Sequence, residues 1–397
     1  MRIDAVELRV AALPLVEPFA TAHGTVSERP LVLVRVLGPD GEGWGECAAL
    51  AEPTYTSEYA DGAIAVLRDH LVPRLLSGAA GDSTGLGAED VAAVLGDVVG
   101  HPMAKAALEL AVLDAEGRRT GSTLAQRLVA GPGRFVDVPG GVAIGLCESP
   151  SALAEEVGRR VAQGYARVKI KIAPGLDVDH ARAARDAAGP DIVLLVDANG
   201  AYRLDAEPGA PDDARRLLDL DGVALAGIEQ PLAPDALLDH AELARRMRTP
   251  ICLDESLSSM ALTAQALDMG ACSVVCVKAP RYGSWLGAAE VLDHCLGNGV
   301  AAYIGGMLDG GFGRAANLAL AAHPACTLPG DISATDRFFT DDVTDARRAI
   351  VQTGPIRFLV PSAPGIGATV DPAGLARLTR HVETVTASPD ETRPRRS

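Results

Sequence analysis

No stretch of this 397-residue sequence is long and apolar enough to cross a membrane, and residues 1–7 alternate like a strand instead of forming the apolar core of a signal peptide. Basic residues are also scarce, since 36 Lys and Arg stand against 52 Asp and Glu and give a formal charge of −16. Nucleic-acid-binding proteins usually carry a basic patch, and this chain has no basic run before its last residues. We therefore expect neither a membrane nor a nucleic acid as a partner.

The sequence also has no cysteine pattern that indicates a disulfide framework. Its seven cysteines are odd in number, scattered, and mostly set in apolar, strand-like segments. We interpret them as reduced residues of the core, which predicts a cytoplasmic protein.

Five short apolar runs that end in charged or polar residues are the most informative feature that is present. They follow one another at intervals of about 24 to 32 residues, the length of one strand, one helix and two loops. The runs are residues 168–172 with Lys169 and Lys171, 196–199 with Asp197, 228–231 with Glu229, 253–256 with Asp254, and 277–278 with Lys278. A chain that repeats strand and helix builds a parallel sheet, and closure of that sheet brings all strand ends to one mouth. Three carboxylates and three amines are thus predicted to face one pocket.

The length of the chain predicts two domains, because a TIM-type barrel takes about 250 residues. Residues 1–125 show strand-like alternation followed by helix-like spacing, which predicts an α+β capping domain. Its strands are expected at residues 5–10, 31–37 and 41–47, and its helices at residues 57–76 and 89–120.

Residues 126–350 are predicted to form the catalytic domain, a modified (β/α)7β barrel of the TIM type, so that the fold class is α/β. The first barrel strand is expected at residues 142–146, because Pro139 has no N–H to donate to a ladder. The last two strands are expected at residues 300–304 and 328–332.

The C-terminal part returns to short strand-like pieces. Residues 351–386, with a helix at about 372–379, are expected to pack back on the capping domain and complete it. The tail at residues 387–397 is polar and contains proline, and we expect it to be disordered.

Asp197, Glu229 and Asp254 are the candidate metal ligands. Carboxylates at three successive strand ends repel one another unless a cation lies between them. A single Asp after a strand is more often a helix N-cap or part of a salt bridge, but three in series at this spacing favour a metal. The ligands are hard oxygen donors and none of the eight histidines lies in these motifs, which favours Mg²⁺, with Mn²⁺ as an alternative, over zinc or copper.

Lys169 and Lys171 are candidate catalytic residues. They are two apart on a strand, so both side chains point to the same face, which we predict to be the barrel interior. Burial beside a second ammonium lowers the pKa of a lysine and makes it a usable base. The alternative is a pair of structural lysines neutralised by the nearby carboxylates.

Lys278 ends an apolar strand four places farther around an eight-stranded ring, which predicts that it lies across the mouth from the lysine pair. The alternative is a lysine whose ammonium reaches out to solvent.

Amines on both sides of a Mg²⁺ site suit one class of reaction. The metal acidifies the C–H next to a bound carboxylate, one amine removes the proton, and the enediolate that forms is reprotonated from the other side.

These motifs together resemble the o-succinylbenzoate synthase / N-acylamino acid racemase family of the enolase superfamily, in its muconate-lactonizing-enzyme-like subgroup, over nearly the whole chain. The resemblance rests on Lys169-Ile170-Lys171, Asp197-Ala198-Asn199, Glu229-Gln230-Pro231, Asp254-Glu255-Ser256, Lys278 and residues 305–314, with further likeness at residues 18–25, 43–47, 55–59 and 328–334. It implies Mg²⁺ on the three carboxylates, Lys171 and Lys278 as the acid/base pair, and Lys169 as the residue that tunes Lys171. It also implies a mobile substrate loop at residues 18–25, a small carboxylate substrate and a homo-oligomer of two to eight subunits. The implied substrate-binding residues are Phe19, Thr21, Gly24, Tyr55, Asn199, Gly305, Gly306 and Met307.

The sequence leaves the reaction itself open between two members of this family. Racemisation of an N-acyl, such as N-succinyl, amino acid and dehydration to o-succinylbenzoate begin with the same proton abstraction. We favour the racemase, because residues 279–284 and Asp309 depart from the family pattern and indicate an altered pocket. Dipeptide epimerisation and cycloisomerisation are further alternatives. A non-catalytic barrel would be expected to have lost at least one of the six charged residues.

Overall fold

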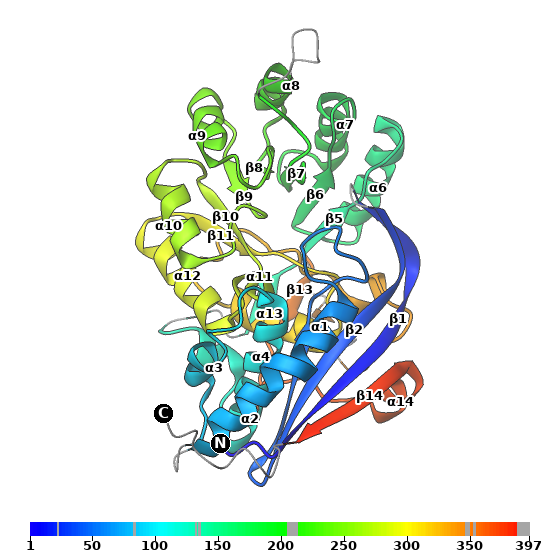
Figure 1. Cartoon of the computed structure of the whole chain (residues 1–397). Coiled ribbons are helices and arrows are strands. Elements are labelled where there is room, and N and C mark those ends of the chain that lie inside the picture. Colours follow the sequence, from blue (N-terminus) through cyan, green and yellow to red (C-terminus); the bar gives the residue numbers. More distant parts are fainter. Residues whose placement is uncertain are drawn as a thin grey trace.

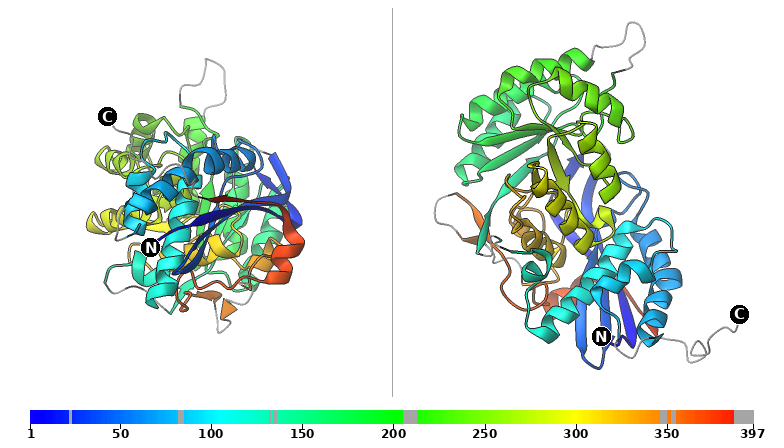
Figure 2. Two further views of the ribbon diagram at one scale, coloured as in Figure 1. Left: turned by 60° about the horizontal axis from the view of Figure 1, so that its bottom comes forward. Right: turned by 90° about the vertical axis from the view of Figure 1, so that its left-hand side faces the viewer.

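The computed structural model describes residues 1–21, 24–81, 85–131, 133, 136–204, 213–345, 350–351 and 355–386 of the chain. One part is a four-stranded antiparallel sheet with its helices, called the cap below (Figure 1). The other is a curled seven-stranded parallel sheet surrounded by helices (Figure 2). This is the predicted α/β barrel with an α+β cap. The predicted tail at residues 387–397 lies outside the described residues.

The cap sheet has the strand order β14-β1-β2-β3. Its strands are β1 (Ala5–Thr21), β2 (Gly24–Gly38), β3 (Gly41–Cys47) and β14 (Thr379–Thr386). β14 pairs antiparallel with β1, so the C-terminal segment completes the sheet begun by the N-terminal one (Figure 1). The first two strands are longer than predicted, because their pairing resumes after a register shift and continues to Thr21 and Gly24. Backbone hydrogen bonds extend this hairpin beyond the part that alternates in hydrophobicity.

The first cap helix is found near its predicted place, as α1 (Ala60–Val66), a π-helical turn (Leu67–Leu71) and α2 (Val72–Gly81). The single helix predicted at 89–120 is wrong. It is divided into α3 (Ala88–Val94) and α4 (Pro102–Thr120), because Gly100 and His101 have positive φ and Pro102 starts a new helix. The short helix α5 (Leu124–Leu128) follows.

α4 packs directly on β3 because the strand carries glycine at the points of contact. A Cβ on Gly43 would lie 2.1 Å from the Ala111 carbonyl oxygen, and one on Gly45 would lie 2.0 Å from the Ala107 carbonyl oxygen. Small residues on both elements let the two backbones approach closely.

The barrel sheet runs in sequence order from one edge to the other. Its strands are β5 (Gly141–Ile144), β6 (Arg167–Lys171), β7 (Val193–Asp197), β8 (Gly227–Glu229), β9 (Ile251–Leu253), β10 (Val274–Val277) and β11 (Ala301–Ile304). The surrounding helices are α6 (Pro150–Ala162), α7 (Val178–Ala188), α8 (Asp213–Asp219) with a 3₁₀ turn (Leu220–Val223), α9 (Leu237–Arg246), α10 (Met260–Asp268), α11 (Ala279–Tyr282), α12 (Trp285–Gly297) and α13 (Gly311–Ala321). None of the described helices is long and apolar enough to cross a membrane.

Residues 326–332 occupy the place of the eighth strand without forming a regular one. The Asp331 N–H donates to the Ile304 carbonyl at 2.8 Å, and the Gly141 N–H donates to the Ile332 carbonyl at 3.1 Å. The segment therefore links β11 to β5 and closes the ring. The prediction of a strand at 328–332 is wrong because Pro329 cannot donate a ladder bond, which breaks regular pairing.

The described chain has a few further short elements next to the first barrel strand and near its C-terminal end. The first barrel strand ends at Ile144, two residues earlier than predicted. The residues just before it form β4 (Asp137–Pro139), which joins β13 (Arg357–Leu359) and β12 (Ile350–Val351) from the C-terminal part in a separate small sheet. A 3₁₀ turn (Thr335–Arg337) and helix α14 (Pro372–Leu378) complete the described chain.

Two buried glutamates of the cap bind the N-termini of barrel helices. Glu109 accepts hydrogen bonds from the Ser284 hydroxyl at 2.6 Å and the Leu286 N–H at 3.2 Å, at the start of α12. Glu46 accepts from the N–H groups of Gly310 and Gly313 at 2.7 and 3.0 Å, at the start of α13. A carboxylate at a helix N-terminus is favoured by the helix dipole, so these contacts fix the cap beside the barrel mouth. The domain boundaries at residues 125 and 350 stay a prediction.

Candidate active site

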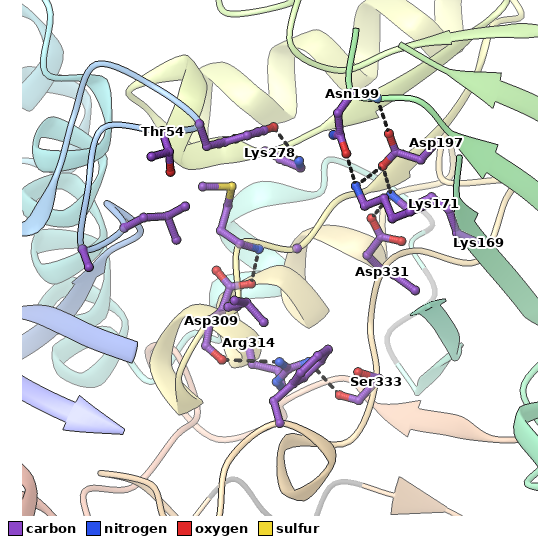
Figure 3. A pocket seen from close by; sticks show the side chains of 18 of the residues that line it. Thr54, Lys169, Lys171, Asp197, Asn199, Lys278, Asp309, Arg314, Asp331 and Ser333 are labelled. Carbon is purple, nitrogen blue, oxygen red and sulfur yellow. Dashed lines mark hydrogen bonds and ion pairs between the residues drawn. The ribbon is translucent and has the colours of Figure 1, made fainter. Parts of the chain in front are cut away.

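A cavity of about 460 Å³ lies at the barrel mouth, between the strand ends and the cap (Figure 3). Strand ends contribute Lys169, Lys171 and Asp197, and the cap contributes residues 50–52 and 54–55. The volume is typical of a site for a small molecule.

Lys171, the last residue of β6, is held at the cavity wall by two side chains. Its Nζ donates to Asp197 Oδ2 at 2.6 Å and to Asn199 Oδ1 at 2.5 Å (Figure 3). Asn199 donates from Nδ2 to Glu255 Oε1 at 2.8 Å. The contacts of Asn199 therefore connect the lysine on β6 to the loop that follows β9.

Lys278, which follows β10, forms a second cluster with a residue of the cap. Its Nζ donates to Asp254 Oδ2 at 2.6 Å and to the Tyr55 hydroxyl at 2.7 Å, and that hydroxyl donates to the same carboxylate oxygen at 2.9 Å. Arg281 donates to Asp254 Oδ1 at 3.2 Å. A Cβ on Gly305 would lie 2.7 Å from Lys278 Cε, so glycine there leaves room for the lysine.

The two clusters lie across the mouth from each other. β7, β8 and β9 separate the two lysine-bearing strands on one side of the ring, and β11, residues 326–332 and β5 separate them on the other. A molecule in the cavity can therefore meet an amine from two opposite sides.

Lys169 lies deeper than Lys171, and only 3% of its surface is exposed. Its Nζ donates to both oxygens of Glu229 at 2.8 and 3.0 Å and to Asp331 Oδ2 at 2.6 Å. Tyr303 also donates to Glu229, and Arg167 donates to Asp331 at 2.5 Å. Lys169 is thus part of a buried ion-pair network beneath the cavity.

The prediction that burial beside a second ammonium lowers the pKa of a lysine is wrong for Lys169 in this arrangement. Burial acts to lower the pKa of Lys169, but Asp331 and Glu229 outweigh it and hold that pKa well above its usual value. Asp254 and Tyr55 likewise outweigh burial at Lys278 and raise its pKa. Desolvation and like-charge repulsion were expected to lower the pKa, whereas carboxylate oxygens of Glu229 and Asp331 lie 2.6 to 3.0 Å from Lys169 Nζ.

Asp197, Glu229 and Asp254, the predicted metal ligands, are buried at or just beyond the ends of β7, β8 and β9. Lys169 Nζ lies 2.8 Å from Glu229 Oε2 and 3.5 Å from Asp197 Oδ2, so one ammonium forms ion pairs with two carboxylates. Burial and the neighbouring Asp197 consequently raise the pKa of Glu229 to about 8. At Asp197 and Asp254, by contrast, the neighbouring Lys171 and Lys278 outweigh burial and lower the pKa. The all-oxygen donor set of the three carboxylates suits a hard divalent cation.

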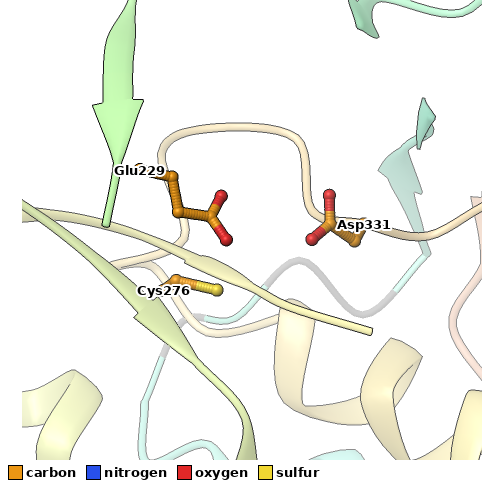
Figure 4. Close-up of side chains that lie close together, drawn as sticks. All are labelled: Glu229, Cys276 and Asp331. Carbon is orange, nitrogen blue, oxygen red and sulfur yellow. The ribbon is translucent and has the colours of Figure 1, made fainter. Parts of the chain in front are cut away.

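A different trio comes together more tightly. Among the described residues, Glu229, Cys276 and Asp331 form a group whose ligand atoms all lie within 4.8 Å of one another (Figure 4). Burial raises the pKa of the Cys276 thiol well above its usual value, so it stays protonated, and Asp331 is already bound by Lys169 and Arg167. A neutral thiol is a poor ligand for a hard cation, which makes this trio the weaker candidate.

The comparison with known proteins shows the family of this chain. Residues 152–374 match the enolase C-terminal domain-like family, and residues 5–128 match the N-terminal domain family of mandelate racemase and muconate lactonizing enzyme. The chain belongs to the enolase superfamily.

Its similar relatives within the superfamily include enzymes with two different names. The chain is 46% identical over 380 residues to an N-succinylamino acid racemase of an Amycolatopsis species, which covers 96% of this chain and 98% of the relative. It is 40% identical over 381 residues to an o-succinylbenzoate synthase of Geobacillus kaustophilus, with 96% of each chain covered. An enolase-superfamily structure from Listeria innocua, 34% identical, has a TM-score of 0.89 over 97% of this chain and 99% of that one. This superfamily enzyme therefore belongs to the branch predicted from its motifs.

Gln230 fixes the ends of two strands of this enolase-superfamily barrel. It has an unusual positive φ of 40°, and its Oε1 accepts from the N–H groups of Asp254 at 3.0 Å and Ser256 at 3.2 Å. Its Nε2 donates to the Ser256 hydroxyl at 2.7 Å. Strained backbone is held where the surroundings determine it, and here it ties the residue after Glu229 to the loop that bears Asp254.

The predicted substrate-binding residues are placed unequally. Tyr55, Asn199, Gly306 and Met307 line the cavity, and Gly305 is not among the lining residues. The side chains of Phe19, Thr21 and Gly24 lie outside what the structure describes, but their backbone forms strand where a loop was expected. Ser27 and Glu28 of the same hairpin line the cavity, so the hairpin reaches its rim. The roles of these residues stay a prediction.

The sequence did not predict which further residues contact the site lysines and carboxylates from distant parts of the chain. Arg167, Tyr303 and Asp331 complete the buried network around Lys169, and Arg281 binds Asp254. Asp331 is a charged residue within a presumed barrel strand, which is the signal that could have drawn attention to it. Tyr303 and Arg167 sit inside apolar strands and have no such local signal.

Proposed function

We propose that this enolase-superfamily enzyme removes and returns the proton α to the carboxylate of an N-acyl amino acid, most specifically an N-succinyl amino acid, and so racemises it. The observation that carries the proposal is the pair of amines on opposite sides of one cavity, Lys171 beside Asp197 and Lys278 beside Asp254. The racemase relative at 46% identity supports the same substrate class.

Asp197, Glu229 and Asp254 are the proposed ligands of one Mg²⁺, which Mn²⁺ can replace. When bound, the cation would supply positive charge that stabilises the enediolate. Lys169 holds Glu229 in place and keeps a positive charge beside Lys171.

In one direction Lys171, as a neutral amine, takes the α-proton, and the electron pair of the broken C–H bond moves into the substrate carboxylate. Lys278, as an ammonium, then gives a proton to the opposite face of the same carbon. The reverse direction exchanges these roles, so each lysine serves one enantiomer. The fixed contacts of both lysines position them for this transfer without a large rearrangement.

Dehydration to o-succinylbenzoate is the second candidate, supported by the synthase relative at 40% identity. In that reaction Lys171 would act twice and Lys278 would stabilise charge. A direct test uses two separate assays. In the first, an N-succinyl amino acid of one configuration is supplied and the loss of optical rotation is measured. In the second, the cyclohexadiene acid precursor is supplied and the formation of o-succinylbenzoate is measured. Racemisation faster than dehydration supports the proposal, and dehydration without racemisation contradicts it.

Tyr55 is proposed to position Lys278 from the cap. Tyr55→Phe removes the hydroxyl that bonds both Lys278 and Asp254, and we expect kcat to fall by about 10-fold with a smaller change in KM, because one hydrogen bond to a charged group is lost. Tyr59→Phe, in the same cap loop and 40% exposed, is the matched control. Equal kinetics of the two variants would rule out a positioning role for Tyr55.

The remaining proposals rest on the family resemblance and on cysteine chemistry. We place the enzyme in the cytoplasm as a homo-oligomer of two to eight subunits, with the β1–β2 hairpin as the substrate lid. All seven cysteines are free, and six of them are buried, which supports a reducing compartment.

A further inference from the structure

Tyr303, on β11, lies inside the barrel and reaches a proposed metal ligand on another strand. It is fully buried, in a small cluster of side chains that includes Cys252 and Cys276 and is separate from the main hydrophobic core. β9 and β10 lie between β8 and β11 in the sheet, so the tyrosine side chain reaches across the barrel interior to contact Glu229. The proposed proton transfers do not use this contact.

The hydroxyl of Tyr303 has one partner of each kind. It accepts a hydrogen bond from the Cys252 thiol at 3.4 Å, and it donates to Oε2 of Glu229. A carboxylate that binds a metal is ionised and can only accept hydrogen bonds, so the proton of this contact belongs to the tyrosine. Tyr303 is therefore a donor directed at one oxygen of the glutamate.

Two cations hold the Tyr303 ring in place. The guanidinium carbon of Arg167 lies 4.5 Å from the ring centre, and Lys169 Nζ lies 5.8 Å from it. Arg167 is fully buried, and a cation that is shielded from water binds an aromatic face more strongly than an exposed one. The hydroxyl is thus presented to Glu229 by a side chain with little freedom to move.

The two carboxylate oxygens of Glu229 consequently have different surroundings. Lys169 donates to Oε1 at 3.0 Å and to Oε2 at 2.8 Å, so the ammonium does not distinguish them. Tyr303 donates to Oε2 alone. Within the described part of the chain, Oε2 has two donors and Oε1 has one, which leaves Oε1 with more capacity for a further partner.

We infer that Tyr303 is a positioning residue that keeps Oε2 of Glu229 bound to the protein and leaves Oε1 as the one oxygen of this glutamate for the cation. The inference rests on the proposed Mg²⁺ ligands Asp197, Glu229 and Asp254. Ca²⁺ accepts a larger and more flexible set of oxygen ligands, often both oxygens of a carboxylate, whereas Mg²⁺ demands a near-octahedral set. A glutamate limited to one oxygen therefore favours Mg²⁺ over Ca²⁺.

Tyr303→Phe removes the hydroxyl and keeps the ring beside the two cations. We expect the Mg²⁺ affinity to fall by about 10- to 100-fold, the usual effect of losing a hydrogen bond to a metal ligand. The Ca²⁺ affinity should stay within a few-fold of the wild type, because Ca²⁺ can use the freed oxygen. Isothermal titration calorimetry of the metal-free, full-length protein with MgCl₂ and with CaCl₂ measures both. An unchanged ratio of the two dissociation constants would overturn the inference, because it would show that Tyr303 supports the fold alone.

Tyr202→Phe is the matched control. Tyr202 is also buried, and it donates at 3.2 Å to Oδ2 of Asp177, which is not among the proposed metal ligands. Both affinities of this variant should equal those of the wild type. A loss of Mg²⁺ preference as large as in Tyr303→Phe would contradict the inference, because the effect would then not depend on the contact with Glu229.

A second measurement needs no variant, so it does not depend on the folding of Tyr303→Phe. In the wild-type protein with ¹³C-labelled glutamate side-chain carboxyl groups, difference infrared spectroscopy isolates the glutamate bands that change when MgCl₂ is added. Binding through one oxygen widens the separation of the two carboxylate stretching bands, and binding through both oxygens narrows it. We expect a wider separation, and a narrower one would overturn the inference. A wild-type protein that binds no Mg²⁺ in the calorimeter would instead refute the proposed metal site, so the two failures are distinguishable.

Discussion

Replacement of Lys278 by alanine is expected to lower the rate of racemisation by about 10²- to 10⁴-fold, the usual contribution of a positioned acid or base. Lys171→Ala should have an effect of the same size. In the proposed mechanism each lysine is the donor or acceptor on one face of the α-carbon, and the described residues place no other amine beside Asp254 or beside Asn199. Steady-state polarimetry with both enantiomers measures the loss.

The matched control for these variants is Lys105→Ala. Lys105 is a half-buried lysine of α4 whose ammonium donates to the Val98 carbonyl, and it does not line the cavity. It should keep the rate within a few-fold of the wild type. If Lys278→Ala also keeps that rate, a two-base mechanism is excluded.

Asp254→Asn is expected to abolish Mg²⁺ binding in the micromolar to millimolar range. The substitution removes one of three negative donors. Loss of a residue that only supports a ligand lowers metal affinity by roughly 10- to 100-fold, and loss of a ligand itself should lower the Mg²⁺ affinity by more. Isothermal titration calorimetry of wild type and variant with MgCl₂ measures this directly, and thermal unfolding of the metal-free proteins checks that the variant is folded.

Cys276→Ala separates the two candidate metal sites, because Cys276 belongs to the tighter trio and Glu229 belongs to both. With Asp197, Glu229 and Asp254 as ligands, the alanine variant should bind Mg²⁺ as tightly as the wild type. Loss of binding in Cys276→Ala together with retention in Asp254→Asn would move the metal to Glu229, Cys276 and Asp331.

The sequence predicted the barrel because charge at strand ends and the βα period are local signals. Lys171, Asp197 and Glu229 stand at the ends of strands that fall close to where the apolar runs predicted them. The eighth strand was predicted wrongly because the prediction used the hydrophobic pattern alone. It did not consider that Pro329 has no N–H to donate to a neighbouring strand. The division between α3 and α4 was missed because the helical apolar spacing was followed across Gly100 and Pro102, although both residues are local signals of a helix boundary.

The electrostatics of the site were harder to predict than its position. Whether a buried lysine gains or loses proton affinity depends on which charge lies nearer, and that depends on side-chain contacts across strands. Asp331 and Tyr303 reach Lys169 and Glu229 from segments more than 70 residues away in sequence.

The measurement that tests the central claim most directly is enantiomer-resolved hydrogen exchange. Each enantiomer of an N-succinyl amino acid is incubated in deuterated water with Lys171→Ala or Lys278→Ala, and mass spectrometry follows α-deuterium. The account predicts that Lys278→Ala exchanges one enantiomer, through Lys171, and that Lys171→Ala exchanges the other. Exchange of both enantiomers by one variant, or of the same enantiomer by both, would contradict the assignment of one lysine to each face.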